Sequence, residues 1–221
     1  MTPVIYLSDA FLATGAEPWS IPSPNGLPDI SVPGHTDRAS FQPYARDEQT
    51  LARPWAVPGT PGLEHRIGGL EKADVTGNVS YDPENHHRMQ LLRAEKVARI
   101  ATDIPPLAAH GPQNGELLVL GWGSTYGAIR SAVERLQSEG WNVAHAHLRH
   151  LNPFPANTGE LLGRYRRVLV PEVNLGQLSL LLRARYLIDV VGYNKVRGKP
   201  FRIAEIRQAA EELLGVKGDD R

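Results

Sequence analysis

Half of the chain's prolines crowd into one stretch, and this crowding limits what that stretch can become. Nine of the 18 prolines lie between Pro18 and Pro61. Because proline fixes φ and has no backbone N–H, this stretch can form neither a long helix nor a central strand. It also holds large apolar residues such as Phe41 and Trp55, too many for a solvated linker. We expect residues 13–82 to form an ordered Pro/Gly-rich strap on a protein surface, with disorder as the alternative.

Strand and helix signals alternate over residues 116–221. The predicted strands cover residues 117–120, 143–147 and 168–170, and the predicted helices cover residues 125–139, 157–162, 176–188 and 203–214. Residues 117–120 and 168–170 are short apolar runs, Trp141-Asn142-Val143-Ala144 opens the second strand, and the helices carry apolar residues at helical spacing. Buried strands that alternate with helices are typical of a parallel sheet covered on both faces. The sequence therefore predicts an α/β domain here.

Two shorter segments precede this domain. Residues 3–7 are an apolar run closed by Ser8, which predicts a buried strand without a neighbouring partner in the sequence. Asp82-Pro83-Glu84 is a helix start, since an Asp cap precedes proline at the first helical position. We therefore divide the chain into residues 1–12 with a lone strand, the strap of residues 13–82, a linking helix and linker at 83–115, and the α/β domain of residues 116–221.

Charge and cysteine content exclude several classes of protein. The chain has 24 basic and 24 acidic residues, so nucleic acid is not expected as its main partner. It has no cysteine, which excludes disulfides, a thiolate nucleophile and a Cys-ligated zinc or iron–sulfur site in this chain. No run of 18 apolar residues exists, so we expect no membrane span. The start of the chain does not resemble a secretory signal, and we expect a cytoplasmic location.

A glycine-rich turn, Gly121-Trp122-Gly123-Ser124-Thr125-Tyr126-Gly127, lies between a predicted strand and a predicted helix. Unpaired N–H groups at a helix start can hold a phosphate or carboxylate, and glycines let the anion approach. The turn lacks the Gly-Lys-Ser/Thr of a Walker loop and the full dinucleotide-binding spacing. The alternative is a tight turn capped by Ser124 or Thr125.

A second polar loop, Pro171-Glu172-Val173-Asn174-Leu175-Gly176-Gln177, follows the third predicted strand. Ligands and partners gather at the carboxyl ends of strands in open parallel sheets. We expect this loop to meet the glycine-rich turn at one edge of the sheet, with Glu172 receiving N–H groups from the helix start at Thr125. Glu172, Asn174 and Gln177 either bind across an interface or hold the loops together.

Two histidine-containing clusters are weaker candidates. His145 and His147 face the same side of a predicted strand and could share a metal, but Arg149 beside them disfavours a cation. The alternative is a pair of structural histidines near the carboxyl edge of the sheet. Glu64-His65-Arg66 in the strap could bind an anionic substrate or form surface ion pairs.

Motifs over essentially the whole chain resemble the alpha subunits of 2-oxoglutarate:ferredoxin oxidoreductases. These motifs are Val4-Ile5-Tyr6-Leu7-Ser8-Asp9, Arg46-Asp47-Glu48, Ala52-Arg53-Pro54-Trp55-Ala56, the segment 58–69 with Pro58-Gly59-Thr60-Pro61-Gly62, the glycine-rich turn, His147-Leu148-Arg149-His150-Leu151-Asn152-Pro153-Phe154-Pro155 and the loop 171–177. Their combination is specific, whereas any one of them alone is not.

The resemblance implies a function and a set of partners. Such enzymes oxidatively decarboxylate a 2-oxoacid to the acyl-CoA with thiamine diphosphate and Mg, and pass electrons through an iron–sulfur cluster to ferredoxin. Residues 116–221 resemble a transketolase C-terminal-like domain, and residues 1–12 resemble the last strand of a truncated pyrimidine-binding domain. The beta subunit carries the diphosphate-binding domain and the cluster. The implied partners are this subunit and the missing N-terminal part of the alpha subunit, with ferredoxin and CoA reached through the complex.

The activating glutamate and the Tyr-Pro-Ile-Thr-Pro-type substrate loop of the family cannot be found in this chain. We therefore assign no catalytic residue, expect no cofactor to be bound by this chain alone, and expect a structural or assembly role. The candidate binding or interface residues are Glu64, His65, Arg66, Gly121, Gly123, Ser124, Thr125, Glu172, Asn174 and Gln177. The alternative is a free-standing, non-catalytic module that binds a small anion or a partner.

Overall fold

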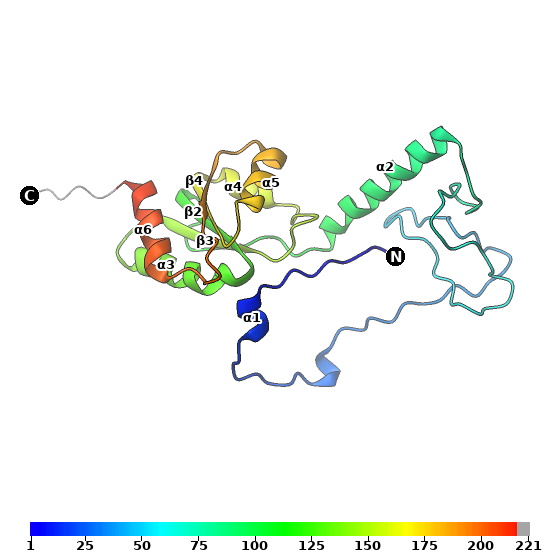
Figure 1. Cartoon of the computed structure of the whole chain (residues 1–221), viewed down its shortest axis with the longest axis horizontal. Coiled ribbons are helices and arrows are strands. Elements are labelled where there is room, and N and C mark those ends of the chain that lie inside the picture. Colours follow the sequence, from blue (N-terminus) through cyan, green and yellow to red (C-terminus); the bar gives the residue numbers. More distant parts are fainter. Residues whose placement is uncertain (216–221) are drawn as a thin grey trace, which may run out of the picture. The chain divides into compact units, whose positions relative to one another are not determined.

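The computed structural model describes residues 1–215 (Figure 1). The chain separates into two compact units. The strap unit comprises Met1–Ile5 and Glu17–Asp103, and the sheet unit comprises Tyr6–Ala16 and the residues from Ile104 onward.

The sheet unit is built on five strands in the order β1-β3-β2-β4-β5. Neighbouring strands run parallel, except that β1 is antiparallel to β3. The strands are β1 (Ala109–His110), β2 (Gly115–Trp122), β3 (Val143–Leu148), β4 (Tyr165–Glu172) and β5 (Val190–Asn194). The predicted parallel sheet is confirmed on β2, β3 and β4. The sequence did not predict β5, and it placed the two residues of β1 in a linker, which is wrong because they pair with Ala146 and His145.

Helices cover both faces of this sheet, as Figure 1 shows. Alternate residues of β2 divide between the faces: Leu117 and Val119 pack with α3 and α6, while Leu118 and Leu120 pack with α4 and α5. The helices are α3 (Tyr126–Ser138), α4 (Thr158–Gly163), α5 (Gln177–Tyr186) and α6 (Ile203–Leu214). This two-sided burial explains the continuous apolar runs in β2 and β4.

The start of the chain differs from the prediction. Residues 3–7 do not form the expected buried strand: Val4 and Ile5 are 90% and 84% exposed, and no described strand pairs with them. A strand requires a hydrogen-bonded neighbour, so an apolar run alone does not create one. A short helix, α1 (Ala10–Thr14), follows, and the Asp9 carboxylate caps it by accepting from the Leu12 N–H at 3.0 Å.

The strap unit combines one long helix with irregular chain. α2 (Pro83–Arg99) begins as predicted, with Asp82 as cap and proline at its first position, and a 3-10 turn, η2 (Ile100–Thr102), follows it. Before it, a 3-10 turn η1 (Pro24–Gly26) and three isolated bridges, such as Tyr44–Val75, are the regular features of the strap. Residues 17–33 are exposed, whereas the later strap buries Leu51 and Leu63.

Lys72 is the most unusual buried group of the strap unit. It is 1% exposed, and its ammonium donates to the backbone carbonyls of Gly68, at 2.8 Å, and Leu70. Its own carbonyl accepts from the Asn85 amide of α2 at 2.9 Å. Lys72 therefore holds a glycine-containing loop and the start of α2 together.

No helix within residues 1–215 is long and apolar enough to cross a membrane.

Candidate functional site

Both polar loops leave the same edge of the sheet. β2 and β4 are parallel neighbours, with Leu118 opposite Val168 and Val119 opposite Leu169. The glycine-rich turn follows β2 and the loop of residues 173–176 follows β4, so both start at the carboxyl ends of adjacent strands. The placement of these loops at one edge therefore agrees with the sequence prediction. The contacts within each loop differ from it.

Thr125 and Gly121 fix the glycine-rich turn. Thr125 is 2% exposed, and its hydroxyl donates to the Trp122 carbonyl at 2.8 Å and accepts from the Trp122 N–H at 3.2 Å. A Cβ on Gly121 would lie 2.5 Å from the Ile129 side chain and 2.8 Å from the Thr125 hydroxyl. Gly123 has a φ of +59°, which glycine adopts without strain. This geometry supports the tight, capped turn, made by a 3-10 turn η3 (Gly123–Thr125) before α3.

Ser124 connects the turn to α1. The pKa of Asp9 is lowered first by the hydrogen bond from the Ser124 hydroxyl, and further by backbone N–H groups that include that of Ser124. The Asp9 carboxylate thus joins α1 to the carboxyl edge of the sheet. The sequence pattern singled out Ser124 but gave no signal for its partner, since the two residues are far apart in the chain.

Glu172, the last residue of β4, is fully buried. One carboxylate oxygen accepts from the Leu178 N–H at 2.8 Å, and the other accepts from the Ser179 N–H at 2.9 Å and the Ser179 hydroxyl at 2.7 Å. These donors lie in the first turn of α5, whose N-terminal flanking residue, Gly176, has no side chain to cap it. Glu172 therefore supplies the missing cap. The expected contact with the helix start at Thr125 is wrong.

Asn174 completes the cap of α5. Its side-chain oxygen accepts from the Gly176 N–H at 2.7 Å and from the Gln177 N–H at 3.2 Å. Together, Glu172 and Asn174 satisfy four consecutive backbone N–H groups, those of residues 176–179. The start of α5 therefore has no free donors in this stretch for an anion. The Gln177 side chain is exposed beside it.

The histidines of β3 form an unsatisfied aromatic cluster. His145 is fully buried, and neither of its ring nitrogens has a hydrogen-bond partner in the described chain. Its ring lies 5.9 Å from that of His147 and 5.4 Å from that of Tyr126, the first residue of α3, measured between centroids. His110 of β1 lies 6.0 Å away on the same measure. These rings form a continuous contact between the edge strand and α3.

Burial keeps both β3 histidines neutral. It lowers the pKa of His145 from 6.5 to about 3, and His147, His110 and Arg130 add to the shift. It lowers the pKa of His147 to about 4, with Arg149 as a second cause, while a hydrogen bond to the Gly123 backbone acts in the opposite direction. Within residues 1–215, no group of three His, Cys, Asp or Glu residues has the arrangement of a metal site. The described contacts of the two rings are with each other, with Tyr126 and with the Gly123 backbone.

Glu64, His65 and Arg66 belong to the strap unit rather than to the sheet edge. The His65 Nδ1 lies 2.9 Å from the Leu63 carbonyl, and its ring packs edge-on against Phe41. Backbone N–H groups at Glu64 and Gly62 lower the pKa of the Glu64 carboxyl. Glu64 and Arg66 are exposed. The structure does not gather the three side chains around one pocket.

Sequence reasoning missed two features of the sheet unit. The first is Ser179, whose hydroxyl donates to the Glu172 carboxylate at the start of α5. Its signal in the sequence is a glutamate seven residues before a serine, with a glycine between them. The second is a pocket of about 540 Å³ in the connection between β5 and α6. Its signal is the sequence Lys195-Val196-Arg197-Gly198-Lys199-Pro200-Phe201-Arg202, which holds four basic residues among eight.

Comparisons with known proteins show what this chain is similar to. The family model described as pyruvate:ferredoxin oxidoreductase core domain II matches residues 115–211. The chain is 54% identical over 206 residues to the 2-oxoglutarate oxidoreductase subunit KorA of Mycobacterium tuberculosis, which covers 93% of this chain and 31% of that protein. The chain is homologous to 2-oxoacid:ferredoxin oxidoreductase alpha subunits.

Two further proteins are similar to most of this chain. The chain is 32% identical over 191 residues to subunit alpha of 2-oxoacid:ferredoxin oxidoreductase 1 of Aeropyrum pernix, covering 81% of this chain and 29% of that protein. The structure of a 2-oxoglutarate:ferredoxin oxidoreductase from Magnetococcus marinus, solved with 2-oxoglutarate, coenzyme A and succinyl-CoA, superposes with a TM-score of 0.81 at 30% identity. The superposition covers 88% of this chain and 34% of that one. The chain thus spans about a third of the length of these alpha subunits.

Proposed function

We propose that this chain is the C-terminal portion of the alpha side of a thiamine diphosphate-dependent 2-oxoacid:ferredoxin oxidoreductase. In the assembled complex, the reaction is the oxidative decarboxylation of 2-oxoglutarate to succinyl-CoA, with ferredoxin as electron acceptor. The observation that carries this proposal is the 54% identity to the Mycobacterium tuberculosis subunit over nearly the whole of this chain. The proposal includes a cytoplasmic location.

Within this complex, we assign the sheet edge a supporting role. The side chains of Thr125, Glu172 and Asn174 are engaged in fixing their own loops. Their polar atoms therefore shape a rigid edge rather than reach for a reacting atom. Ser124, Gln177 and the exposed residues Glu64 and Arg66 are proposed to contact partner subunits. The partners are the beta subunit and the remaining part of the alpha subunit.

The iron–sulfur cluster of the family does not fit the residues of this chain. Thiamine diphosphate, when bound, supplies the electron sink for decarboxylation, and an iron–sulfur cluster carries the electrons. A cluster of the usual kind needs thiolates, and this chain has no cysteine. We propose that thiamine diphosphate, Mg and the cluster are held by the other subunits, and we assign this chain no step of the reaction.

Reconstitution tests the proposal. The chain is purified alone, mixed with the remaining alpha region and the beta subunit, and analysed by gel filtration and by 2-oxoglutarate- and CoA-dependent ferredoxin reduction. We expect no turnover from the chain alone, a stable complex in the mixture, and turnover only in that complex. Omission of this chain from the mixture is the matched control.

Two results would contradict the proposal. A mixture with the same turnover whether or not this chain is added would remove its role in the enzyme. A monodisperse chain with a cooperative melt that binds neither subunit would instead favour a free-standing, non-catalytic module for a small anion or a partner.

A further inference from the structure

The helix α5 carries leucines on both its inner and its outer side. Leu178 and Leu182, four residues apart, are buried against the sheet. Leu180 and Leu181 lie on the outer side and are 68% and 49% exposed. A helix that is apolar on both sides is typical of one that is covered on both sides. The outer side of α5 is therefore an uncovered apolar surface in the described chain.

Leu187, directly after α5, extends this outer side in a strained conformation. Its side chain is 90% exposed, and its φ is +55°. A side chain strains the backbone in this region, so glycine or asparagine is the common residue there at the end of a helix. Neither burial nor backbone preference within the described chain accounts for a leucine at this position. An outlier of this kind indicates a role outside the fold itself.

Arg183 holds Leu187 in place. The Arg183 guanidinium donates to the Val190 carbonyl at 3.0 and 2.6 Å and to the Asp189 carboxylate at 2.7 Å. The Arg183 carbonyl accepts from the Leu187 N–H at 3.0 Å. These bonds join the end of α5 to the start of β5. Leu187 is therefore presented by a fixed turn, which lowers the entropy cost of binding a partner.

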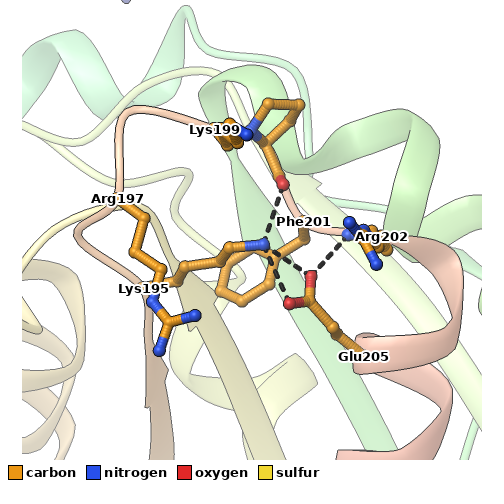
Figure 2. Close-up of a pocket in the computed structure, with 7 residues that line it drawn as sticks. Lys195, Arg197, Lys199, Phe201, Arg202 and Glu205 are labelled. Carbon is orange, nitrogen blue, oxygen red and sulfur yellow. Dashed lines mark hydrogen bonds and ion pairs between the residues drawn. The ribbon is translucent and has the colours of Figure 1, made fainter.

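The residues beyond the other end of β5 differ from this surface, because they pair within the chain. The Lys195 ammonium donates to both carboxylate oxygens of Glu205, at 2.9 and 2.7 Å, and to the Pro200 carbonyl at 3.0 Å (Figure 2). Leu180 and Leu187, in contrast, stay mostly exposed. The stronger candidate for an interface is therefore α5.

The charges beside the leucines indicate the kind of partner. α5 contains Arg183 and Arg185 and no acidic residue. The nearby Asp189 carboxylate is already paired with Arg183. A partner with carboxylates beside its apolar residues would complement this charge. An amphipathic helix is the element whose apolar side chains form a stripe of matching shape.

A second copy of this chain fits this face less well. In a two-fold pair the same patch meets itself, so the arginine-flanked sides of the two helices would face each other and repel. α5 has 10 residues and is about 15 Å long. Its outer side is far smaller than the ~800 Å² that each partner buries in a stable interface. Docking at α5 is therefore one part of a larger contact, as between the subunits of a complex.

We propose that the outer side of α5, with Leu180, Leu181, Ala184 and Leu187, binds an amphipathic helix of another subunit whose apolar face is flanked by acidic residues. This inference rests on the proposed function, because the partner helix would belong to the assembled oxidoreductase. Gln177, already assigned to a partner contact, is exposed at the start of the same helix.

Leu187→Asn separates docking from folding, because the two expected effects have opposite signs. Asparagine tolerates a positive φ better than leucine, so the variant chain alone should melt at the same temperature as the wild type or higher. Its affinity for the mixture of the remaining alpha region and the beta subunit, measured by biolayer interferometry, should fall at least about tenfold. A residue that served only the fold would not show this combination.

Arg185→Glu tests the charge of the partner. Its affinity for the same mixture should fall at least about fivefold at low salt, and the loss should shrink as salt rises. Arg135→Glu is the matched control, since Arg135 is an exposed arginine in the last turn of α3, on the opposite face of the sheet. This control should bind like the wild type.

Photocross-linking identifies the occupant. With p-benzoylphenylalanine in place of Leu180, the reconstituted complex should give a cross-link to a helix of another subunit that carries acidic residues beside its apolar face. A cross-link to a second copy of this chain, or to a segment without acidic residues, would overturn the inference. Unchanged affinity of both Leu187→Asn and Arg185→Glu in an intact complex would overturn it while leaving the proposed function standing. If the wild-type chain binds neither subunit, the proposed function fails and this inference fails with it.

Discussion

Glu172 and His145 are both fully buried polar residues on strands that flank β2, yet their surroundings are opposite. The Glu172 carboxylate accepts three hydrogen bonds, whereas neither ring nitrogen of His145 has a partner in the described chain. The difference comes from position. Glu172 ends its strand beside a helix start, which supplies unpaired N–H groups, while His145 lies within a strand whose backbone groups are engaged in the sheet. Hydrogen bonds therefore offset the desolvation cost of burial at Glu172, whereas no described partner offsets it at His145.

The largest loss of stability is expected when the Glu172 carboxylate, the better-paired of the two groups, is removed. Glu172→Ala leaves three donors at the start of α5 without an acceptor, and we expect it to destabilise the sheet unit by about 3–4 kcal/mol. Chemical denaturation measures this loss directly, and the melting temperature should fall by roughly 10 °C.

Glu172→Gln is the control for this substitution, because the amide keeps one acceptor oxygen and nearly the same volume. It should cost clearly less than Glu172→Ala. If Glu172→Ala costs under about 1 kcal/mol, the carboxylate is not the main cap of α5, and the comparison with His145 fails.

His145, which is buried without a described partner, should make the stability of the sheet unit depend on pH. Its pKa is about 3 in the folded chain and 6.5 without the fold. The unfolded chain therefore takes up the proton first as pH falls below about 6.5, and stability is highest above that pH. Between pH 6.5 and 5, His145 should account for a loss of about 2 kcal/mol, since each pH unit corresponds to about 1.4 kcal/mol.

Denaturation curves across that pH range for the wild type and for His145→Leu check this expectation. The variant should show a shallower pH dependence, and at neutral pH it should be as stable as the wild type or more so, because it removes two unsatisfied nitrogens. The acidic groups with lowered pKa values, such as Asp9 and Glu205, act at lower pH. An unchanged slope would show that His145 is hydrated or paired in solution.

A methyl group at Gly121 tests the packing beside the histidines. Its Cβ would lie 2.5 Å from the Ile129 side chain and 3.1 Å from the His147 Nδ1. We expect Gly121→Ala to destabilise the sheet unit by about 1.5 kcal/mol, measured by denaturation. Gly127→Ala, in the same turn, meets no described atom within 4 Å and lies in α3, so it should be neutral or stabilising. Equal losses from both substitutions would contradict the close packing at Gly121.

The smallest loss of stability is expected from substitution of Asn174. Asn174→Ala removes the acceptor for the Gly176 and Gln177 N–H groups, but this part of the loop is partly open to water, which replaces the lost partner. We expect a loss of about 1 kcal/mol in the denaturation experiment. A loss as large as that of Glu172→Ala would mean that the two caps act as one unit.

Sequence patterns were sufficient to predict the three central strands of the sheet. β2, β3 and β4 are buried on both faces; β2 and β4 contain unbroken apolar runs, and β3 is apolar except for His145 and His147. β5 contains Gly192 and buries only its first residue, Val190, and β1 has only two residues, so neither has such a run. The run at residues 3–7 misled the prediction because apolar character reports a preference for burial, and pairing requires a neighbour.

The candidate loops were located correctly but their contacts were not. Glu172 was expected at the start of α3, whereas it caps α5, which begins only five residues after it. Closing such a short loop costs less entropy than bringing two distant segments together. Side-chain partners far apart in sequence, such as Asp9 and Ser124, leave no trace in local spacing. The proposed function rests on the family resemblance, because local spacing does not indicate it.

The buried ammonium of Lys72 gives the strap unit its own chemical reporter. Amine-reactive reagents modify accessible lysines, and Lys72 is 1% exposed with its ammonium bound to two carbonyls. Its modification requires the strap unit to open, whereas Lys199 is exposed and reacts in the folded chain. The ratio of the two modification rates, read by mass spectrometry, therefore measures how often the strap unit opens, independently of whether the sheet unit remains folded.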